Sequence, residues 1–388
     1  MLETTAADRF GLGWRAPLAA GILVNLDRID VLEVLADDYV HASRRERRAL
    51  RTLARQVPVT LHGTSLGLAS TETVTARRLE RLARLVGEIE PVAWSEHLAF
   101  VRGGELEIGH LAAPARCAET VDGLVANVRR AREIVGSAPL LENVATLVDP
   151  PRSVLGEDEW VSRCIEGSGA PLLLDLHNLH ANATNFGFDA VSHLRRIPLH
   201  RVAQVHLAGG RWVERHGARR ILDDHLHDVP DPVFALLAEV ARLAPQPLVV
   251  ILERDGNFET IEDLLAELDR ARAVVAGARR EPRHGLDAPV GEAAANPSRR
   301  EPNLAPVTPP STPRRWRWPR WGERRGAEAH VTPTIEATMA RVFVDEAARV
   351  RFAAAEPTLD RSGLALAAES YARKRAAKAR GHDPTPRR

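Results

Sequence analysis

The sequence predicts an α/β protein whose first two-thirds form a (β/α)8 barrel. Short apolar runs without a helical polar face alternate with amphipathic helical stretches up to about residue 279. Eight such runs can be counted, which is the number of strands in a closed (β/α)8 barrel. An open doubly wound sheet is the structural alternative. That fold usually carries a glycine-rich turn after its first strand, and the sequence has none there.

Each predicted strand is a short apolar run that ends at polar residues, as buried parallel strands do. The runs cover residues 10–14, 30–34, 58–62, 92–97, 139–142, 171–175, 202–206 and 248–253. The run at 171–175 is the clearest, because it stops abruptly on Asp175. His177, Asn178 and His180 follow it directly and could hold a cation or hydrogen-bond a substrate.

The stretches between these runs have apolar residues at helical spacing. They cover residues 17–26, 43–56, 71–87, 119–135, 158–166, 189–196, 231–243 and 259–276. Thr71 is expected to cap the third of these helices, because its hydroxyl can accept from free first-turn amides. In the last helix, Leu264, Leu265 and Leu268 lie on one face.

Composition limits the class of protein. The 388 residues are 44% apolar, which is enough for a large core, and a formal net charge of +1 does not favour nucleic acid or a membrane surface as partner. Cys117 and Cys164 form neither a metal-ligand spacing nor a disulfide framework, which favours a reducing compartment. We find no signal peptide and no apolar run of about 18 residues, so we expect a cytoplasmic protein.

The character of the sequence changes after the predicted barrel. We predict three parts, a metal-dependent catalytic barrel at 1–279, a disordered linker at 280–330 and a small helical segment at 331–388. Residues 281–325 are rich in proline, arginine and alanine, which is typical of disorder. Within them, RWRWPRW at 315–321 favours a docking or adhesive patch, with an anionic surface or nucleic acid as the alternative contact. Two short helices are predicted at 334–354 and 364–377.

Ionisable residues follow most of the predicted strands. In a barrel the carboxyl ends of all strands point to one face, where active sites lie. The residues at these ends are His62, His97, Glu142, Asp175, His206 and Glu253, and their neighbours include Asn178, Asp223, Asp224 and His225. Burying so many carboxylates without a counter-charge would cost many kcal/mol or force them to bind protons.

Bound metal is the simplest compensation for these carboxylates. Histidines and carboxylates without thiolates favour iron, manganese or zinc. Nine or ten potential donors exceed the four to six that one ion takes, so we predict two or three ions, with a carboxylate such as Glu142 as a bridge.

Each of these residues also has a simpler interpretation. A single histidine at a strand end is more often structural, and Asp223 or Asp224 could cap the helix that begins near Asp231. Glu33 and Asp37 are as readily structural as ligating. Of His177 and His180, only one can face the same way as Asp175. We assign no metal-binding role to the remaining histidines, which include His110, His193, His200 and His216.

Seven motifs follow one another along the predicted barrel. They are HGTSLGL (62–68), SEHLAF (95–100), LLENV (140–144), LLLDLHN (172–178), VHLAGG (205–210), LDDH with VPDPVFALL (222–237) and ILERDGN (251–257). In this order they resemble the DUF692 family, the multinuclear non-heme iron-dependent oxidative enzymes that modify ribosomally made peptides. The resemblance covers roughly residues 10–276 and implies a (β/α)8 barrel with two or three irons at its mouth.

The resemblance implies a specific set of iron ligands. The family's D-x-x-N falls on Asp175 and Asn178, and its D-x-H falls on Asp223 and His225. The implied set is His62, His97, Glu142, Asp175, Asn178, His206, Asp223, His225 and Glu253. The chain departs from the family at His177, where asparagine is common, and in the doubled Asp223–Asp224. Residues 210–220 are also unusually basic.

The resemblance also implies a mechanism and partners. A mixed-valent iron pair would activate O2, and the substrate would be a cysteine thiolate of a precursor peptide. Cys117 and Cys164 lie in or before helices, so we expect neither to take part. Family members often act with a helical partner protein. The C-terminal segment is therefore either a fused partner or docking module or an accessory tail without a role in recognition.

Two other functions stay open from the sequence. One is a manganese- or zinc-dependent barrel of the sugar isomerase or endonuclease IV kind, which needs no O2. Lysine occurs only in the tail, which argues against a lysine-dependent version of that chemistry. The other is a metal-binding scaffold without catalysis, for which an incomplete ligand set would be expected.

Overall fold

A computed structural model describes residues 7–215, 217–258, 260–281, 334–356 and 359–379. The predicted linker from residue 282 onward and the RWRWPRW cluster lie outside the described residues. The barrel and the C-terminal helices belong to one compact unit. The proposed division of the chain into three parts therefore stays a prediction.

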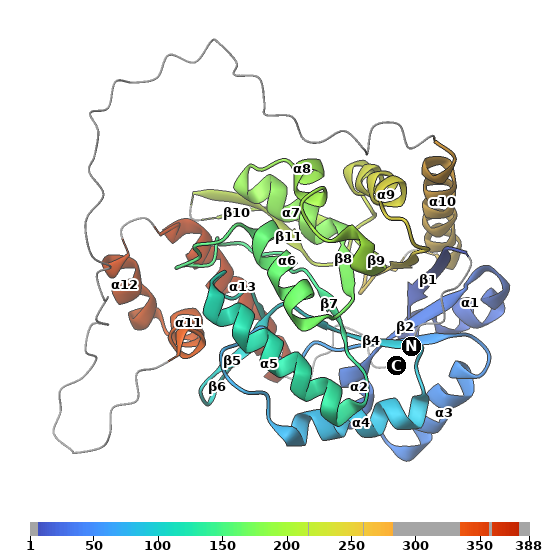
Figure 1. Cartoon of the computed structure of the whole chain (residues 1–388), viewed down its shortest axis with the longest axis horizontal. Helices are drawn as coiled ribbons and strands as arrows, with labels where there is room; N and C mark the ends of the chain where they lie inside the picture. Colours follow the sequence, from blue (N-terminus) through green and yellow to red (C-terminus); the bar gives the residue numbers. More distant parts are fainter. Residues whose placement is uncertain (1–6, 216, 259, 282–333, 357–358, 380–388) are drawn as a thin grey trace, which may run out of the picture. The chain divides into compact units, whose positions relative to one another are not determined.

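Eight parallel strands close into a barrel, as the sequence predicts (Figure 1). β1 pairs with both β2 and β12, which closes the ring. The strands, in their order around the barrel, are β1 (Arg9–Gly13), β12 (Val249–Leu252), β9 (Val202–Leu207), β8 (Leu172–Asp175), β7 (Leu140–Glu142), β4 (Ala93–His97), β3 (Val59–His62) and β2 (Val31–Leu35).

Helices connect the strands, and their apolar faces pack on the barrel. The helices that follow β1 to β7 are α1 (Ala19–Val24), α2 (Ala36–Val40), α3 (Arg44–Ala54), α4 (Ala76–Ile89), α5 (Ala118–Val135) and α6 (Glu157–Ser168). The later ones are α7 (Leu176–Phe186), α8 (Ala190–Leu194), α9 (Asp231–Leu243) and α10 (Ile261–Arg280). Short 3-10 turns lie at Ala16–Leu18, Leu26–Arg28 and Leu199–Arg201.

The predicted start of α4 is wrong. Thr75, not Thr71, precedes the first turn. The preceding loop is hydrogen-bonded to Asn127, whose side chain accepts from the backbone N–H of Val74 at 2.9 Å and donates to three loop carbonyl groups. Thr71 instead donates its backbone N–H and its hydroxyl to the carboxylate of Glu336, at 2.8 and 2.6 Å. Long-range hydrogen bonds thus override the local capping signal.

Two β-hairpins and two helices, α2 and α7, were not predicted. The hairpins are β5 (Phe100–Gly103) with β6 (Leu106–Ala112), and β10 (Gly210–Arg215) with β11 (Ala218–Asp223). Both carry charged residues in place of a continuous apolar run, which hides them from a search for buried strands. α7 begins immediately after β8, where Asp175 accepts from the Asn178 amide at 2.6 Å and caps the helix.

The C-terminal segment forms three helices, α11 (Ile335–Val344), α12 (Glu346–Ala355) and α13 (Arg361–Ala379). They lie beside the β5–β6 hairpin (Figure 1). Together they bury a second apolar cluster separate from the barrel core. Its largest members are Phe100, Ile108, Met339, Phe343, Phe352 and Tyr371. Arg220 of β11 also donates to Asp360 at 3.0 Å, so both hairpins contact this segment.

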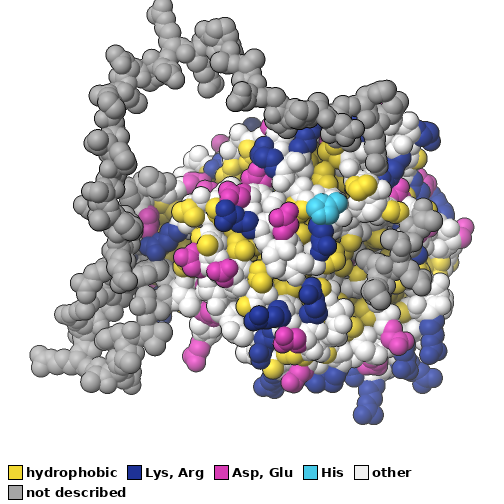
Figure 2. Space-filling model, viewed as in Figure 1, with side chains coloured by type: hydrophobic (Ala, Val, Ile, Leu, Met, Phe, Trp, Pro, Cys, Tyr) yellow, Lys and Arg dark blue, Asp and Glu magenta, His cyan; other side chains and the backbone are white. Residues whose placement is uncertain are grey.

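Basic and acidic side chains are interspersed on the face shown in Figure 2, and neither kind forms a large patch there. This mixture agrees with the small net charge. Among the helices of the described residues, none has the length and apolar character needed to cross a membrane.

Candidate metal centre

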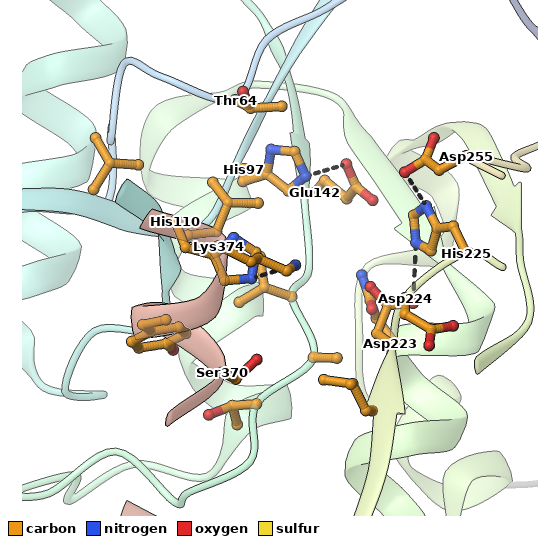
Figure 3. Close-up of a pocket in the computed structure, with 18 of the residues that line it drawn as sticks. Thr64, His97, His110, Glu142, Asp223, Asp224, His225, Asp255, Ser370 and Lys374 are labelled. Atoms are coloured by element: carbon orange, nitrogen blue, oxygen red, sulfur yellow. Dashed lines mark hydrogen bonds and ion pairs between the residues drawn. The ribbon is translucent and has the colours of Figure 1, made fainter. Parts of the chain in front are cut away.

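A cavity of about 350 Å³ opens at the carboxyl ends of the barrel strands. Its size lies near the lower end of the range of about 300–1000 Å³ that is usual for small-molecule sites. Its floor is polar and comes from the barrel. Figure 3 shows His97 and Glu142 on one side of it and Asp223, His225 and Asp255 on another.

The structure brings the predicted ligands together. His62, His97, Glu142 and Asp175 are the last residues of β3, β4, β7 and β8. His206 lies on β9, and Glu253 directly follows β12. The other three come from α7 and from the end of the β10–β11 hairpin, namely Asn178, Asp223 and His225.

His62, His97 and Glu142 form one potential metal-binding group, with ligand atoms within 4.8 Å of one another. The Nε2 atoms of His62 and His97 lie 3.5 and 3.1 Å from Glu142 Oε2. The opposite ring nitrogens are occupied. His62 Nδ1 lies 2.7 Å from the Ser95 hydroxyl, and His97 Nδ1 lies 3.0 Å from the Gly63 carbonyl oxygen. These contacts fix both rings with Nε2 directed at Glu142, as outer partners of metal ligands do.

Three further groups share members with the first and with one another. They are Glu142, Asp175 and His206; Asp175, His225 and Glu253; and Glu33, His206 and Glu253. His206 Nδ1 lies 3.4 Å from Glu142 Oε1 and 3.3 Å from Glu253 Oε2. Glu142 therefore presents one oxygen to the first group and the other to His206. Shared carboxylates allow adjacent metal ions to be bridged.

Glu33, which the sequence left undecided, lies directly against His206. Its Oε2 is 3.0 Å from His206 Nε2, and the amide of Gln204 contacts the same two atoms. The Nδ1 atom on the other side of the ring faces Glu142 and Glu253. Although burial lowers the pKa of His206, the three carboxylates outweigh it and raise that pKa well above its usual value, so a metal ion bound at Nδ1 would displace a proton. Glu33 thus orients His206, although its position also permits it to ligate.

The donor atoms of this cluster fit a metal centre. Several are buried and make no hydrogen bond of good geometry within the described residues, although His225 Nε2 lies 3.0 Å from Asp223 Oδ1 and Glu142 Oε2 lies 3.1 Å from His97 Nε2. A buried polar atom without a hydrogen bond is costly unless something else satisfies it. These atoms are Glu33 Oε1, Glu142 Oε2, Asp175 Oδ2, Asn178 Oδ1, His206 Nδ1 and His225 Nε2. Five of the six belong to predicted ligands, and a cation would satisfy them together.

The electrostatics of the cluster point the same way. Burial lowers the pKa of His97 and holds the pKa of His62 well below its usual value, so both imidazoles are neutral and can donate a lone pair. Burial, with the charges of Glu142 and Asp223, raises the pKa of Asp175 to about 7. Burial also raises the pKa of Glu142. Without a cation these carboxyl groups hold protons more readily, so metal binding should release protons.

His177 occupies the position where the sequence departs from the family, and it binds a neighbouring side chain. Its Nδ1 lies 2.8 Å from Asp223 Oδ1, and that oxygen is also 3.0 Å from His225 Nε2. A β-carbon at Gly210 would lie 2.6 Å from the His177 ring, so glycine is needed for the hairpin to approach it. His225 itself has a positive φ of 55°, which is uncommon for histidine and typical of constrained sites.

The remaining candidates contact other groups. Asp37 accepts from the backbone N–H and hydroxyl of Thr64 at 2.7 and 3.0 Å, so it is structural here. Asp224 accepts from Arg211 at 2.9 Å and contacts His227 at 3.0 Å. His180 lies 6.4 Å from His177, measured between ring centroids.

The C-terminal helix α13 supplies part of the cavity wall, which sequence reasoning missed. Ser370, Tyr371 and Lys374 line the cavity together with Gly109 and His110 of β6. Figure 3 shows Lys374 beside His110 and facing the side chains of the candidate ligands. Lysine occurs only in the tail, as the sequence shows, and this packing brings one tail lysine, Lys374, to the cavity. No sequence signal reveals this, because the contact joins residues 264 positions apart.

The fold and the site together define a (β/α)8 barrel with buried His–carboxylate groups that could hold metal ions. The chain belongs to the family of RiPP precursor modification enzymes MbnB/TglH/ChrH, whose model matches residues 9–276. RiPPs are ribosomally synthesised and post-translationally modified peptides. This membership confirms the family predicted from the seven motifs.

Relatives and solved structures each match about 70% of the chain. A UPF0276 protein of Caulobacter vibrioides is 33% identical over 276 residues, which are 70% of this chain and 96% of the relative. A UPF0276 protein of Streptomyces avermitilis is 36% identical over 278 residues, 70% of this chain and 56% of the relative. A xylose isomerase-like TIM barrel protein from Mycobacterium smegmatis is 10% identical, with a TM-score of 0.46 over 70% of this chain and 98% of that one.

Proposed function

We propose that this protein is an iron-dependent oxidative enzyme that uses O2 to modify a ribosomally synthesised peptide at cysteine. Family membership supports a peptide substrate. The single observation that carries the proposal is the sharing of Glu142, Asp175, His206 and Glu253 between adjacent groups of ligand atoms. Such sharing suits two or three neighbouring ions, and a ligand set of imidazoles and carboxylates without thiolates suits iron.

We assign the metal ions to three neighbouring positions. His62, His97 and Glu142 would hold the first, and Glu142, Asp175 and His206 the second. Asp175, His225 and Glu253 would hold the third, with Asn178 and Asp223 completing the set. When bound, iron would supply the electrons that reduce O2 and the Lewis acidity that favours a thiolate. Glu33, Ser95 and the Gly63 carbonyl group hold the imidazoles in the required orientation.

We also propose that the C-terminal segment takes the place of a separate helical partner in peptide recognition. Its helices bury an apolar cluster with the β5–β6 hairpin, and α13 lines the cavity above the ligands. A segment in this position can contact a peptide that enters the cavity. An accessory tail without a role in recognition would not need to supply part of the cavity wall.

O2 consumption with matched peptides tests the proposed reaction. Protein loaded anaerobically with iron is exposed to O2 with synthetic cysteine-containing peptides, each paired with its serine counterpart. We expect faster O2 uptake with a cysteine peptide than with its serine counterpart, together with a change in the mass of the cysteine peptide. Serine removes the soft thiolate ligand while preserving the size of the side chain.

The alternatives give different outcomes. Equal O2 uptake with both peptides of every pair would contradict modification at cysteine. Turnover of a sugar under anaerobic conditions by manganese- or zinc-loaded protein would favour the isomerase-like function. Iron binding without any turnover would favour a scaffold.

A further inference from the structure

We infer that Lys374 is a carboxylate-binding residue of the substrate cavity, supplied by the C-terminal helix α13. The inference rests on the proposed function, because it specifies one more feature of the peptide: a carboxylate close to the residue that is modified. In Figure 3 the amine of Lys374 is directed into the cavity, across from His225 and Asp223.

The hydrogen bonding of Lys374 leaves donors free. Its Nζ donates to His110 Nε2 at 2.8 Å. Burial, helped by the charge of Lys374, keeps the pKa of His110 well below its usual value, so His110 is neutral and can accept at Nε2. An ammonium group has three N–H donors, and this contact takes one. Within the described part of the chain, no ion pair joins Lys374 to a carboxylate.

The other cation that lines the cavity is already neutralised. Arg15 donates through Nε and Nη2 to Asp255 Oδ1, at 2.8 and 2.5 Å, and lies 3.7 Å from Glu253. Of the acidic residues that line the cavity, Glu142, Asp223 and Glu253 are proposed ligands, whose charge the metal ions would take up. The others already accept hydrogen bonds elsewhere, Asp37 from Thr64, Glu107 from Arg78, Asp224 from Arg211 and Asp255 from Arg15. Lys374 is therefore the cation at this cavity that is free to pair with an incoming anion.

Lys374 is exposed, and its hydrogen-bond partner His110 is held in place by packing. The ring of His110 stacks edge-on with Tyr371 at 5.3 Å, and Tyr371 does the same with Phe343 at 4.8 Å. Gly109, with a φ of 80°, lets α13 come close, because a β-carbon there would lie 2.4 Å from Arg375 Cγ. His110 therefore presents Nε2 at a fixed place on the cavity wall, and the hydrogen bond to it keeps the Lys374 ammonium group at the cavity.

A carboxylate is the anion that a peptide carries. It can be the terminal carboxylate of a peptide modified at its last residue, or the side chain of an aspartate or glutamate next to the modified residue. Both sources present the same group to the two free N–H donors. A charge-assisted hydrogen bond of this kind contributes about 1.5–3 kcal/mol, which is about tenfold or more in affinity.

The test compares acids with their amides by calorimetry on the full-length iron-loaded protein. The first pair is N-acetylcysteine and N-acetylcysteinamide, and the second replaces cysteine by alanine. A third pair, acetyl-Cys-Glu-amide and acetyl-Cys-Gln-amide, carries the carboxylate on a side chain. We expect the wild type to bind the acid of at least one cysteine pair about tenfold more tightly than its neutral counterpart. Acid preference in the first pair identifies a terminal carboxylate as the source, and acid preference in the third pair identifies a side-chain carboxylate.

Lys374→Met should remove this preference while leaving affinity for the neutral compounds and the iron content unchanged. Lys374→Arg should keep it. Arg373→Met is the matched control, because Arg373 is an exposed neighbour on α13 outside the cavity lining, and it should behave as the wild type. A wild type without acid preference in any pair, or an unchanged preference in Lys374→Met, would overturn the inference.

The alanine pair separates this inference from the proposed function. If Lys374 confers acid preference in the alanine pair but the cysteine compounds bind no more tightly than the alanine compounds, modification at cysteine loses its support and the role of Lys374 stands. If the cysteine compounds bind more tightly than the alanine compounds but show no acid preference that depends on Lys374, modification at cysteine keeps its support and the role of Lys374 is overturned.

Discussion

Glu142→Gln should remove at least one metal ion per chain and abolish O2-dependent turnover. Glu142 is 1% exposed, and its two oxygens face different histidines, His97 at 3.1 Å and His206 at 3.4 Å. An amide keeps the size of the side chain but loses the charge and one acceptor oxygen, so it cannot bridge two cations. Removing an outer partner of a metal ligand costs about 10–100-fold in affinity, and removal of a shared ligand should cost more.

Metal content per chain, measured by elemental analysis after gel filtration, checks this prediction. Glu157→Gln is the matched control. Glu157 accepts from the side-chain amide of Asn182 at 3.0 Å, and burial raises its pKa to about 7. Unlike Glu142, it belongs to none of the potential metal-binding groups among the described residues. The control should keep the metal content of the wild type. Full metal occupancy in a folded Glu142→Gln protein would contradict the assignment of Glu142 as a shared ligand.

Deletion of residues 282–388 should abolish peptide processing but leave the metal ligands in place. All proposed ligands lie between His62 and Glu253, whereas the deletion removes α11, α12 and α13. It also exposes the apolar side of the β5–β6 hairpin, including Phe100 and Ile108, so the shortened protein should aggregate more readily. Unchanged processing by the shortened protein would contradict a role of the segment in recognition.

A point substitution tests the same segment with less disturbance. Phe343 is 5% exposed within the second apolar cluster, and Phe343→Ala should cost about 3–5 kcal/mol in the packing of these helices. Val350 on α12 is 63% exposed, so Val350→Ala should change stability by only about 0.5 kcal/mol or less. We expect peptide processing to fall in Phe343→Ala and not in Val350→Ala, with iron content unchanged in both. Thermal unfolding and peptide mass spectrometry provide the two measurements.

The barrel and the convergence of the ligands could be predicted because parallel strands have a strict geometry. A polar residue that ends a buried strand must lie at the mouth, so His62, His97, Glu142 and Asp175 were found from position alone. Asn178, Asp223 and His225 were candidates as neighbours of these residues, and the resemblance to the family implied them as ligands. They lie on α7, at the end of β11 and in the loop that follows it. Their geometry does not follow from strand periodicity.

Features set by tertiary contacts could not be predicted. Glu33 lies in the middle of β2, and only the closed barrel shows that it faces His206 from a strand far away in the sequence. α4 begins after Thr75 and not after Thr71, because Asn127 and Glu336 form hydrogen bonds with the preceding loop. Lys374 reaches the cavity only because α13 packs on β6, and no local pattern encodes that contact.

The central claim, a multinuclear iron centre, is tested most directly by Mössbauer spectroscopy with metal analysis on anaerobically purified protein. We predict two or more irons per chain with antiferromagnetic coupling, since adjacent groups of ligand atoms share Glu142. The coupling should be absent in Glu142→Gln. Stoichiometric zinc or manganese without iron in active protein would contradict the account and favour an isomerase- or nuclease-like function.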